Sequence, residues 1–382
     1  MDALRRGDNL VARKIFEQLH AAGNADASIC FALAIACQRL RDHECALTSI
    51  GVALEQDAGN FQYLLLKADL LADTGQHRKA AAFYLSAVRA SAELTNVPVA
   101  LKPEVVRAQE MCAHYASELE ELVLSHLAKL AAAQGHADLS LAPRISAALE
   151  ILFGRKQIYP QRPRYLNFPG LAPIQFFEPT QFDWIPRLEA QSDQIRAELE
   201  GVLCDHNAFA PYVERRDHPS DATQAGMVDN PDWSAFYLWK NGELVGKNAA
   251  RCPHTTRAMA DVPLTRIANR SPSVLFSLLR PGAHIPPHHG LINTRLIAHL
   301  PLIVPGKCRL RVGNDTREWV PGKIWVFDDT IEHEAWNDSN QTRVILLFEI
   351  DRPDITADEQ ALVRGIFAAI DGHSGQRPEW EI

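Results

Sequence analysis

The first third of the chain has its hydrophobic positions at helical spacing, and the pattern repeats every 34 residues. At this interval a small residue is followed four positions later by a larger apolar one: Ala12 and Phe16, Ala46 and Ile50, Ala80 and Tyr84. A small residue lets two antiparallel helices approach closely, and the larger one fills the gap to the next pair. The pattern predicts stacked helix pairs over residues 1–94, with a helical bundle of accidental period as the other interpretation. Helical spacing continues through residues 104–154, which predicts one or two longer capping helices.

A different pattern begins at residue 155. Five prolines between residues 155 and 181 exclude a regular helix, so we place a domain boundary between residues 154 and 155. Residues 185–204 then carry one apolar stripe, which predicts a single amphipathic helix: Leu188, Ile195, Leu199 and Val202. A polar, irregular loop is expected at residues 207–230. Beyond it, short β-runs alternate with turn residues up to residue 350, the pattern of a sandwich or closed barrel.

Two of the predicted strands carry charged residues on an otherwise apolar path. In residues 294–304, alternation puts four apolar side chains on one face (Leu296, Ala298, Leu300 and Leu302) and a mixed set on the other (Arg295, Ile297 and His299). In the last strand, Arg343 falls opposite the face that holds Val344, Leu346, Phe348 and Ile350. Because an unpaired buried charge is costly, we expect both arginines to point into one polar or ligand-filled cavity.

Composition and charge narrow the class of protein. The sequence is 47% hydrophobic and 23% charged, as in a globular protein, and its net charge of −8 argues against a dedicated nucleic-acid binder. The seven cysteines are scattered and never form a CxxC pair, which predicts free thiols in a reducing compartment. The N-terminal residues lack the apolar run of a signal peptide, and no stretch has the roughly 18 apolar residues of a membrane span. We therefore expect a cytoplasmic protein.

Histidines cluster in the strand-rich part. His284, His288, His289 and His299 fall within sixteen residues, and His333 follows His288 by 45. Neutral imidazoles are ligands for iron or zinc, and an arginine such as Arg343 can hold a carboxylate through two parallel N–H bonds. The residue types are consistent with a metal-dependent oxygenase that uses an anionic organic cosubstrate. A hydrogen-bonded network of core histidines is the alternative.

Both parts of the chain resemble known families. The repeat resembles the tetratricopeptide repeat, although its tryptophan-like position holds Cys30 or Leu64 and its closing proline is absent. The runs SLLRPGAHIPPHHGLINTRLIAHLPLIVP, WVPGKIWVFDDTIEHEAWN and TRVILLFEID resemble the aspartyl/asparaginyl β-hydroxylase family of Fe(II)- and 2-oxoglutarate-dependent oxygenases. The second resemblance covers roughly residues 165–355. Together they imply an α + β protein of two domains: a tetratricopeptide-like helical solenoid over residues 1–154, and a double-stranded β-helix, a jelly-roll or cupin-like barrel, over residues 155–382.

The resemblance also implies roles for individual residues. His288 and His333 match the family's iron ligands, and Arg343 and Ser277 match the residues that hold the far carboxylate of 2-oxoglutarate. His299 matches a histidine near the cosubstrate carboxylate at the metal, and Arg295 a residue on the substrate side.

Other positions qualify these roles. Gly290 stands where most related oxygenases carry a carboxylate ligand, which implies a two-histidine centre. His289 is a second candidate for the ligand position of His288. Ile297 replaces a substrate-binding arginine of the peptide-hydroxylating members. Asp328 and Asp329 are expected in a turn or supporting role rather than as ligands.

The resemblance implies a dioxygenase that uses Fe(II), 2-oxoglutarate and O2. The expected reaction is hydroxylation of an unactivated C–H, with the β-carbon of an Asp- or Asn-type residue in a peptide, carrier-bound or small-molecule substrate as the leading target. The repeat domain favours a protein or peptide partner, because a helical solenoid presents a long concave surface. Three alternatives stay open: an iron and 2-oxoglutarate halogenase, a lipid acyl-chain hydroxylase, and a non-catalytic repeat scaffold.

Overall fold

In the computed structural model the chain divides into two compact units, Met1–Arg155 and Lys156–Ile382. The structure describes residues 1–382 except 24–25, 95–96, 134–142, 214–225 and 375–382. The boundary expected from the proline-rich stretch, between residues 154 and 155, falls one residue before this division. Each unit has its own hydrophobic clusters.

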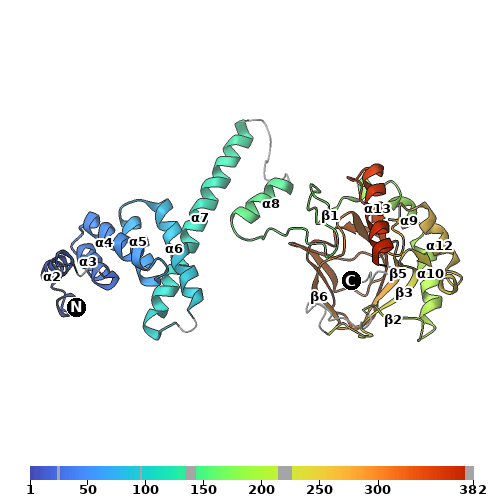
Figure 1. Ribbon diagram of the computed structural model, residues 1–382, viewed down its shortest axis with the longest axis horizontal. Helices are drawn as coiled ribbons and strands as arrows, with labels where there is room; N and C mark the ends of the chain where they lie inside the picture. The colour runs from blue at the N-terminus through green and yellow to red at the C-terminus, as the bar shows by residue number, and fades with distance from the viewer. Residues whose placement is uncertain (24–25, 95–96, 134–142, 214–225, 375–382) are drawn as a thin grey trace. The chain divides into compact units, whose positions relative to one another are not determined.

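The first unit is built of helices, as the 34-residue pattern predicts (Figure 1). Its helices are α1 (Asp2–Arg5), α2 (Asn9–Ala21), α3 (Ala27–Arg39), α4 (His43–Gln56), α5 (Phe61–Asp73), α6 (His77–Glu93), α7 (Lys102–Ala133) and α8 (Pro143–Leu152), with a short 3-10 turn at Val99–Leu101. The repeated small residues Ala12, Ala46 and Ala80 lie on α2, α4 and α6, and all three are buried. The larger residues four positions later are buried beside them, so the repeat marks the contact between successive helices.

The turns between paired helices repeat as well. Gly7, Arg41 and Gly75 are 34 residues apart, and all three have a positive φ, of 84°, 58° and 73°. In each case the next amide donates to the carbonyl five residues before it, at 2.9, 2.9 and 2.8 Å. This is the Schellman arrangement, which ends a helix on a left-handed residue.

One cysteine prediction is wrong. Cys37 on α3 and Cys45 on α4 form a disulfide in the structure, because the turn between the two helices brings residues eight apart into contact. The other five form no disulfide: Cys30, Cys112, Cys204, Cys252 and Cys308. The cysteines therefore no longer support the reducing compartment that their spacing suggested.

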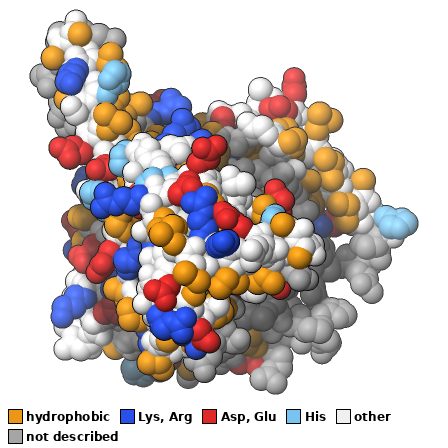
Figure 2. All heavy atoms as spheres, turned by 90° about the vertical axis from the view of Figure 1, so that its left-hand side faces the viewer, with side chains coloured by type: hydrophobic (Ala, Val, Ile, Leu, Met, Phe, Trp, Pro, Cys, Tyr) orange, Lys and Arg blue, Asp and Glu red, His pale blue; other side chains and the backbone are white. Residues whose placement is uncertain are grey.

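Apolar side chains also reach the surface of the first unit. On α2, Leu10, Val11 and Ile15 are exposed. Figure 2, which faces the N-terminal helices, shows hydrophobic side chains in small groups among charged ones. Single exposed apolar residues are common in soluble proteins, so this distribution alone indicates no partner.

The second unit consists of two antiparallel sheets. The larger has the order β1-β10-β7-β12-β5-β3-β2, with β4 paired to β3, and the smaller has the order β6-β11-β8-β9. The strands are β1 (Phe176–Phe177), β2 (Ala210–Pro211), β3 (Trp233–Lys240), β4 (Glu243–Leu244), β5 (Val274–Leu279), β6 (His284–His288), β7 (Arg295–Ile303), β8 (Cys308–Val312), β9 (Asp315–Glu318), β10 (Trp325–Phe327), β11 (His333–Asn337) and β12 (Arg343–Asp351). The described strands do not close into one barrel, so the expected jelly-roll barrel is not confirmed. The coarser expectation, an α + β protein of two domains, is confirmed.

Helices pack on one face of the large sheet. The residues of the predicted amphipathic stripe, 188, 195, 199 and 202, are buried against the core residues of β7 and β12. The single helix expected there is instead two, α9 (Ile185–Glu189) and α10 (Ser192–Leu203), because the backbone leaves helical geometry at Gln191, the N-cap of α10. Residues 246–261, expected to be β-runs and turns, form α11 (Gly246–Ala249), α12 (Pro253–Ala258) and a 3-10 turn. The C-terminal helix α13 (Ala357–Ser374) completes the unit.

Candidate functional site

Strand alternation on β7 and β12 separates the core from a cavity, as the sequence predicts. Leu296, Ala298, Leu300 and Leu302 pack in the helix-covered core, together with alternate residues of β12. The intervening residues of both strands line a cavity between the two sheets: Ile297, His299, Arg343, Ile345 and Leu347. His288 from β6 and His333 from β11 line the same cavity.

His288 and His333 are register partners in the small sheet. Their ring centroids are 4.0 Å apart. Each ring is held by a carbonyl two residues earlier: Nδ1 of His288 lies 2.8 Å from the Pro286 oxygen, and Nδ1 of His333 lies 3.1 Å from the Ile331 oxygen. A carbonyl only accepts, so Nδ1 carries the hydrogen and the Nε2 lone pair of each ring is left for another partner.

Burial keeps both imidazoles neutral. It lowers the pKa of His288 to about 4, and it lowers the pKa of His333 well below its ordinary value, with the neighbouring His288 adding to the effect. A neutral ring with a fixed tautomer is the form that ligates metals. Among the described residues, no three His, Cys, Asp or Glu side chains gather closely enough to bind a metal. The two-histidine centre that the resemblance implies from Gly290 stays a prediction.

Two other histidines of the cluster lie elsewhere. His284 is partly exposed; its Nε2 lies 2.9 Å from Glu334 and its ring stacks on Trp336. His289 is absent from the residues that line the cavity, because it follows His288 directly and alternation turns it away. Of the two adjacent candidates, the cavity geometry favours His288.

Arg343 is a fully buried guanidinium with few partners. Its Nη1 donates to the Ser277 carbonyl at 3.3 Å, and its guanidinium carbon lies 4.6 Å from the centre of the Trp319 ring. Its Nε has no acceptor, and no described carboxylate pairs with it. Burial lowers the pKa of Arg343 to about 10. A buried cation without a counter-ion is unfavourable, so the cavity is suited to an anion at this position.

Ser277 and His299 lie beside this cation. The Ser277 hydroxyl accepts a bond from the Trp233 indole at 3.3 Å, which leaves its own hydrogen for a ligand. His299 is buried, and its Nδ1 has no partner. Burial, followed by the charge of Arg343, holds the pKa of His299 well below its ordinary value. The predicted cosubstrate residues 277, 299 and 343 thus meet in one cavity.

Arg295 lies differently from Arg343. It is fully buried, its Nη1 donates to Asp329 at 2.9 Å, and its Nε lies 2.7 Å from Glu349. It is not among the cavity-lining residues, so the expectation that both arginines point into one cavity is wrong for Arg295. The two carboxylates compensate its charge within the protein. Its role on the substrate side stays a prediction.

Asp329 occupies the space beside Gly290. A Cβ atom at position 290 would lie 2.0 Å from the Asp329 Oδ2 and 2.2 Å from its Cγ. The Gly290 amide also donates to the Asp329 carbonyl at 2.7 Å. The volume that a side chain at position 290 would fill is therefore taken by the carboxylate of Asp329, which lies in the loop before His333.

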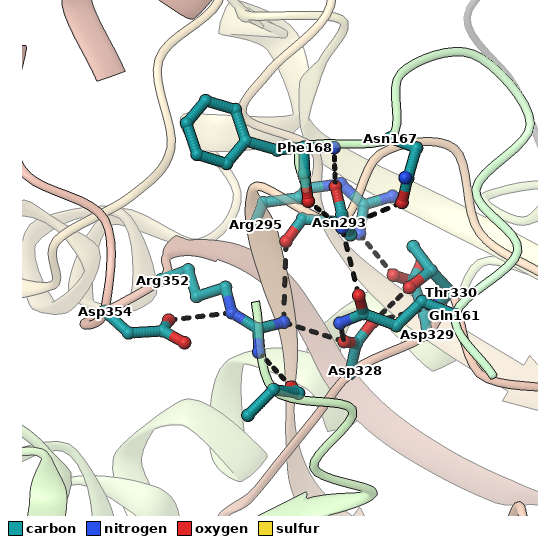
Figure 3. Close-up of polar contacts among 11 residues, drawn as sticks. Gln161, Asn167, Phe168, Asn293, Arg295, Asp328, Asp329, Thr330, Arg352 and Asp354 are labelled. Atoms are coloured by element: carbon teal, nitrogen blue, oxygen red, sulfur yellow. Dashed lines mark hydrogen bonds and ion pairs between the residues drawn. The ribbon is translucent and has the colours of Figure 1, made fainter. Parts of the chain in front are cut away.

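Asp328 has the supporting role expected of it. Its Oδ1 accepts from the amide and the hydroxyl of Thr330, at 3.0 and 2.5 Å, and its Oδ2 accepts from Arg352 at 2.7 Å (Figure 3). The sequence interpretation missed several members of the site. The aromatic walls Tyr212, Trp233 and Trp319 belong to the cavity, and Gln161, Asn293 and Arg352 form a buried network beside it.

Comparisons with known proteins cover most of the unit that contains this site. Residues 189–353 match the family model of aspartyl/asparaginyl β-hydroxylase. The chain is 33% identical over 191 residues to the ornithine lipid ester-linked acyl 2-hydroxylase of Rhizobium tropici, which covers 49% of this chain and 64% of that protein. It is 35% identical over 135 residues to the aspartyl/asparaginyl β-hydroxylase of Homo sapiens, 35% of this chain and 18% of that protein. The chain thus spans less than two thirds of either relative.

Solved structures resemble each unit only loosely. The secretion chaperone SycD of Yersinia enterocolitica covers 31% of this chain and 79% of its own, at 18% identity and a TM-score of 0.29. A predicted oxalate decarboxylase of Thermotoga maritima covers 31% of this chain and 81% of its own, at 14% identity and a TM-score of 0.21. Likenesses this weak carry no argument. None of the described helices combines the length and apolar composition needed to cross a membrane.

Proposed function

We propose that the chain, whose residues 189–353 match the family model of aspartyl/asparaginyl β-hydroxylase, belongs to that family and is an Fe(II)- and 2-oxoglutarate-dependent dioxygenase that hydroxylates an unactivated C–H. His288 and His333 would hold the iron. Arg343, Ser277 and His299 would hold 2-oxoglutarate.

The observation that carries the proposal is the buried, unpaired Arg343. A guanidinium of this kind needs an anion, and 2-oxoglutarate is a dicarboxylate. Arg343 presents an Nε without an acceptor, and Ser277, whose hydroxyl accepts from Trp233 and keeps its own hydrogen for a ligand, lines the same cavity. A planar guanidinium can hold one carboxylate by two parallel bonds.

The residues of the site also fit a metal. The Nε2 atoms of His288 and His333 are both free, and the carbonyls behind them fix the tautomer that a metal requires. Iron with 2-oxoglutarate and O2 supplies the oxidising chemistry that replaces C–H by C–OH, with succinate and CO2 as coproducts. The chain's own contribution is to orient the two cosubstrate carboxylates and to exclude water with apolar walls such as Trp319 and Phe327.

The leading substrate is an Asp- or Asn-type residue in a peptide, carrier-bound or small-molecule form. The stacked helix pairs of the first unit support a protein or peptide partner, because such repeats present a concave surface.

A second substrate class is favoured by two observations at the cavity. Ile297 gives an apolar wall at the position where peptide-hydroxylating members of the family carry a substrate-binding arginine, and Arg295 is already neutralised by Asp329 and Glu349. Neither position offers a free cation to an acidic side chain. An acyl chain would meet mostly apolar walls, and one relative is an acyl 2-hydroxylase by name.

The first prediction separates the metal role from the cosubstrate role. His333→Ala should abolish iron binding, because it removes one of two ligands. Arg343→Ala should keep the metal but raise the 2-oxoglutarate Kd by about 10- to 100-fold, the effect of losing a charged hydrogen-bonded pair. Metal content after anaerobic reconstitution and 2-oxoglutarate titration measure the two effects. Equal loss of metal in both variants would contradict the assigned roles, and absence of both metal and succinate release in the unmodified chain would favour the scaffold alternative.

The second prediction concerns the substrate. If Ile297 sets the class, an acyl lipid should stimulate succinate release and gain one oxygen in mass, whereas an Asp-containing peptide should not. Ile297→Arg should then weaken turnover of the acyl substrate by about tenfold or more, since it introduces a charge to the apolar wall. Peptide hydroxylation by the unmodified chain would instead support the leading class. A chloride-dependent product mass would indicate a halogenase.

A further inference from the structure

The segment directly after the unit boundary lies against both loops that carry the proposed metal ligands. We call residues 157–172 the connector. Its backbone amides donate to one loop at Gly290 and Leu291, just after His288, and to the other at Thr330, just before His333. The three bonds, from residues 164, 165 and 162, measure 3.1, 2.9 and 2.8 Å.

Gln161 joins the same two loops through its side chain. Its Nε2 donates to the Asp328 Oδ2 at 2.5 Å, and its Oε1 accepts from the Asn293 Nδ2 at 3.1 Å (Figure 3). Asn293 and Asp328 are both fully buried. One amide therefore links the loop after His288 to the loop before His333, and both of its ends are used.

Buried partners hold each end of this link in place. Asn293 Oδ1 accepts from the Phe168 amide at 2.7 Å, which ties it to the connector. Arg352 donates to the Asp328 Oδ2 at 2.7 Å and to the Ala172 carbonyl at 2.6 Å. In Figure 3 the Arg352 guanidinium lies between Asp328 and Asp354, with Gln161 on the far side of Asp328.

The loop fixed in this way sets the orientation of His333. Asp328 accepts from the Thr330 amide, and the next residue, Ile331, supplies the carbonyl that holds Nδ1 of His333. A loop that shifts moves this carbonyl and turns the imidazole. The sheet register fixes the backbone of His288 opposite His333, but it does not fix the ring orientation.

We infer that Gln161 is a positioning residue for the proposed metal site: it holds the loop before His333 to the loop after His288. The inference rests on the proposed function, because it takes His288 and His333 as the ligands. It assigns a role at the metal site to a segment that lies outside the residues 189–353 of the family match.

Cobalt(II) binding to the full, metal-free chain tests the inference without any need for turnover. Gln161→Ala should raise the cobalt Kd roughly tenfold, the scale on which groups behind metal ligands act. The matched control is Gln157→Ala in the same connector. Gln157 bonds Asn314 only through its backbone amide and carbonyl, so this variant should bind cobalt as the unmodified chain does. Visible absorption gives the Kd, and thermal melting without metal reports the fold.

A second variant keeps the test informative if Gln161→Ala does not fold. Gln161→Glu keeps the size but places a carboxylate against Asp328, and it should weaken cobalt binding at least as much. A melting temperature that falls while the cobalt Kd of both variants stays within about twofold of the unmodified value would show a purely structural role and overturn the inference. The His333→Ala variant distinguishes failure of the positioning role from failure of the ligand assignment. If it binds no cobalt while the Gln161 variants bind normally, only the positioning role fails; if it binds cobalt normally, the ligand assignment fails and the inference with it.

Discussion

Gly290 and Asp329 share one small volume beside His288. The Asp329 carboxylate is not a flexible end that can swing away, because Arg295 holds it at 2.9 Å inside the protein. The absence of a side chain at position 290, from which the resemblance implies a two-histidine centre, is therefore also a packing requirement. A methyl group added at position 290 would clash with the Asp329 carboxylate, which Arg295 holds in place.

The third prediction follows from this contact. Gly290→Ala should destabilise the second unit by about 1–3 kcal/mol, the usual cost of overpacking a filled site. The matched control is Gly365→Ala on α13, where no atom lies within 4 Å of the added Cβ and where alanine favours the helix. Urea unfolding of both variants measures the difference. If the two variants have the same free energy of unfolding, the Asp329 carboxylate moves aside more easily than its ion pair with Arg295 indicates.

At the scale of residues, the sequence predicts the side-chain positions correctly where strand alternation alone determines the face that a residue occupies. The side chains of β7 and β12 face as the sequence indicates, and His299 and Arg343 reach the cavity. Arg295 does not, because its partners Asp329 and Glu349 come from a loop and a neighbouring strand whose positions no local pattern reveals. The hydrogen bonds of Gln161 could not be predicted for the same reason, because they join residues up to 167 apart in sequence.

At the scale of elements, the helix-ending turns of the first unit are the most regular feature. The left-handed position is glycine in two of the three turns and Arg41 in the third. A side chain in this region of φ costs roughly 1–2 kcal/mol relative to the right-handed form, whereas glycine tolerates it. The middle turn therefore contains a residue that its own conformation disfavours.

The fourth prediction uses this irregularity. Arg41→Gly should stabilise the first unit by up to about 1 kcal/mol, since the gain at the turn exceeds the added flexibility of the unfolded chain. Arg41 is exposed, so no packing is lost. The reciprocal variant Gly75→Arg should destabilise by a similar amount. Chemical denaturation of the full chain gives both values, and a destabilised Arg41→Gly would contradict the account.

Elements with strong periodicity were predicted well, and those set by single residues were not. The helices of the 34-residue repeat and the apolar stripe on α9 and α10 follow the sequence. In the hairpin between β3 and β4, Asn241 and Gly242 both have the positive φ of a type I′ turn. The break between α9 and α10 did not follow from the sequence, because the apolar stripe runs through it without interruption. α11 and α12 are too short for their periodicity to stand out against the flanking strands.

At the scale of the whole molecule, the change from helical to strand periodicity was enough to predict two domains and their order. Closure of the strands was not predictable in this way, since alternation fits a sandwich, an open pair of sheets or a barrel equally well. The cosubstrate and the metal came from resemblance, because residue types alone left a hydrogen-bonded core network open.

The two faces of β7 serve separate purposes. Core residues at positions 296, 298, 300 and 302 support the helices, while position 297 forms part of the cavity wall. A substitution at position 297 can therefore alter the shape and polarity of the cavity without repacking the core. Because one strand serves both purposes on alternate residues, the lining of the cavity and the stability of the unit can change independently.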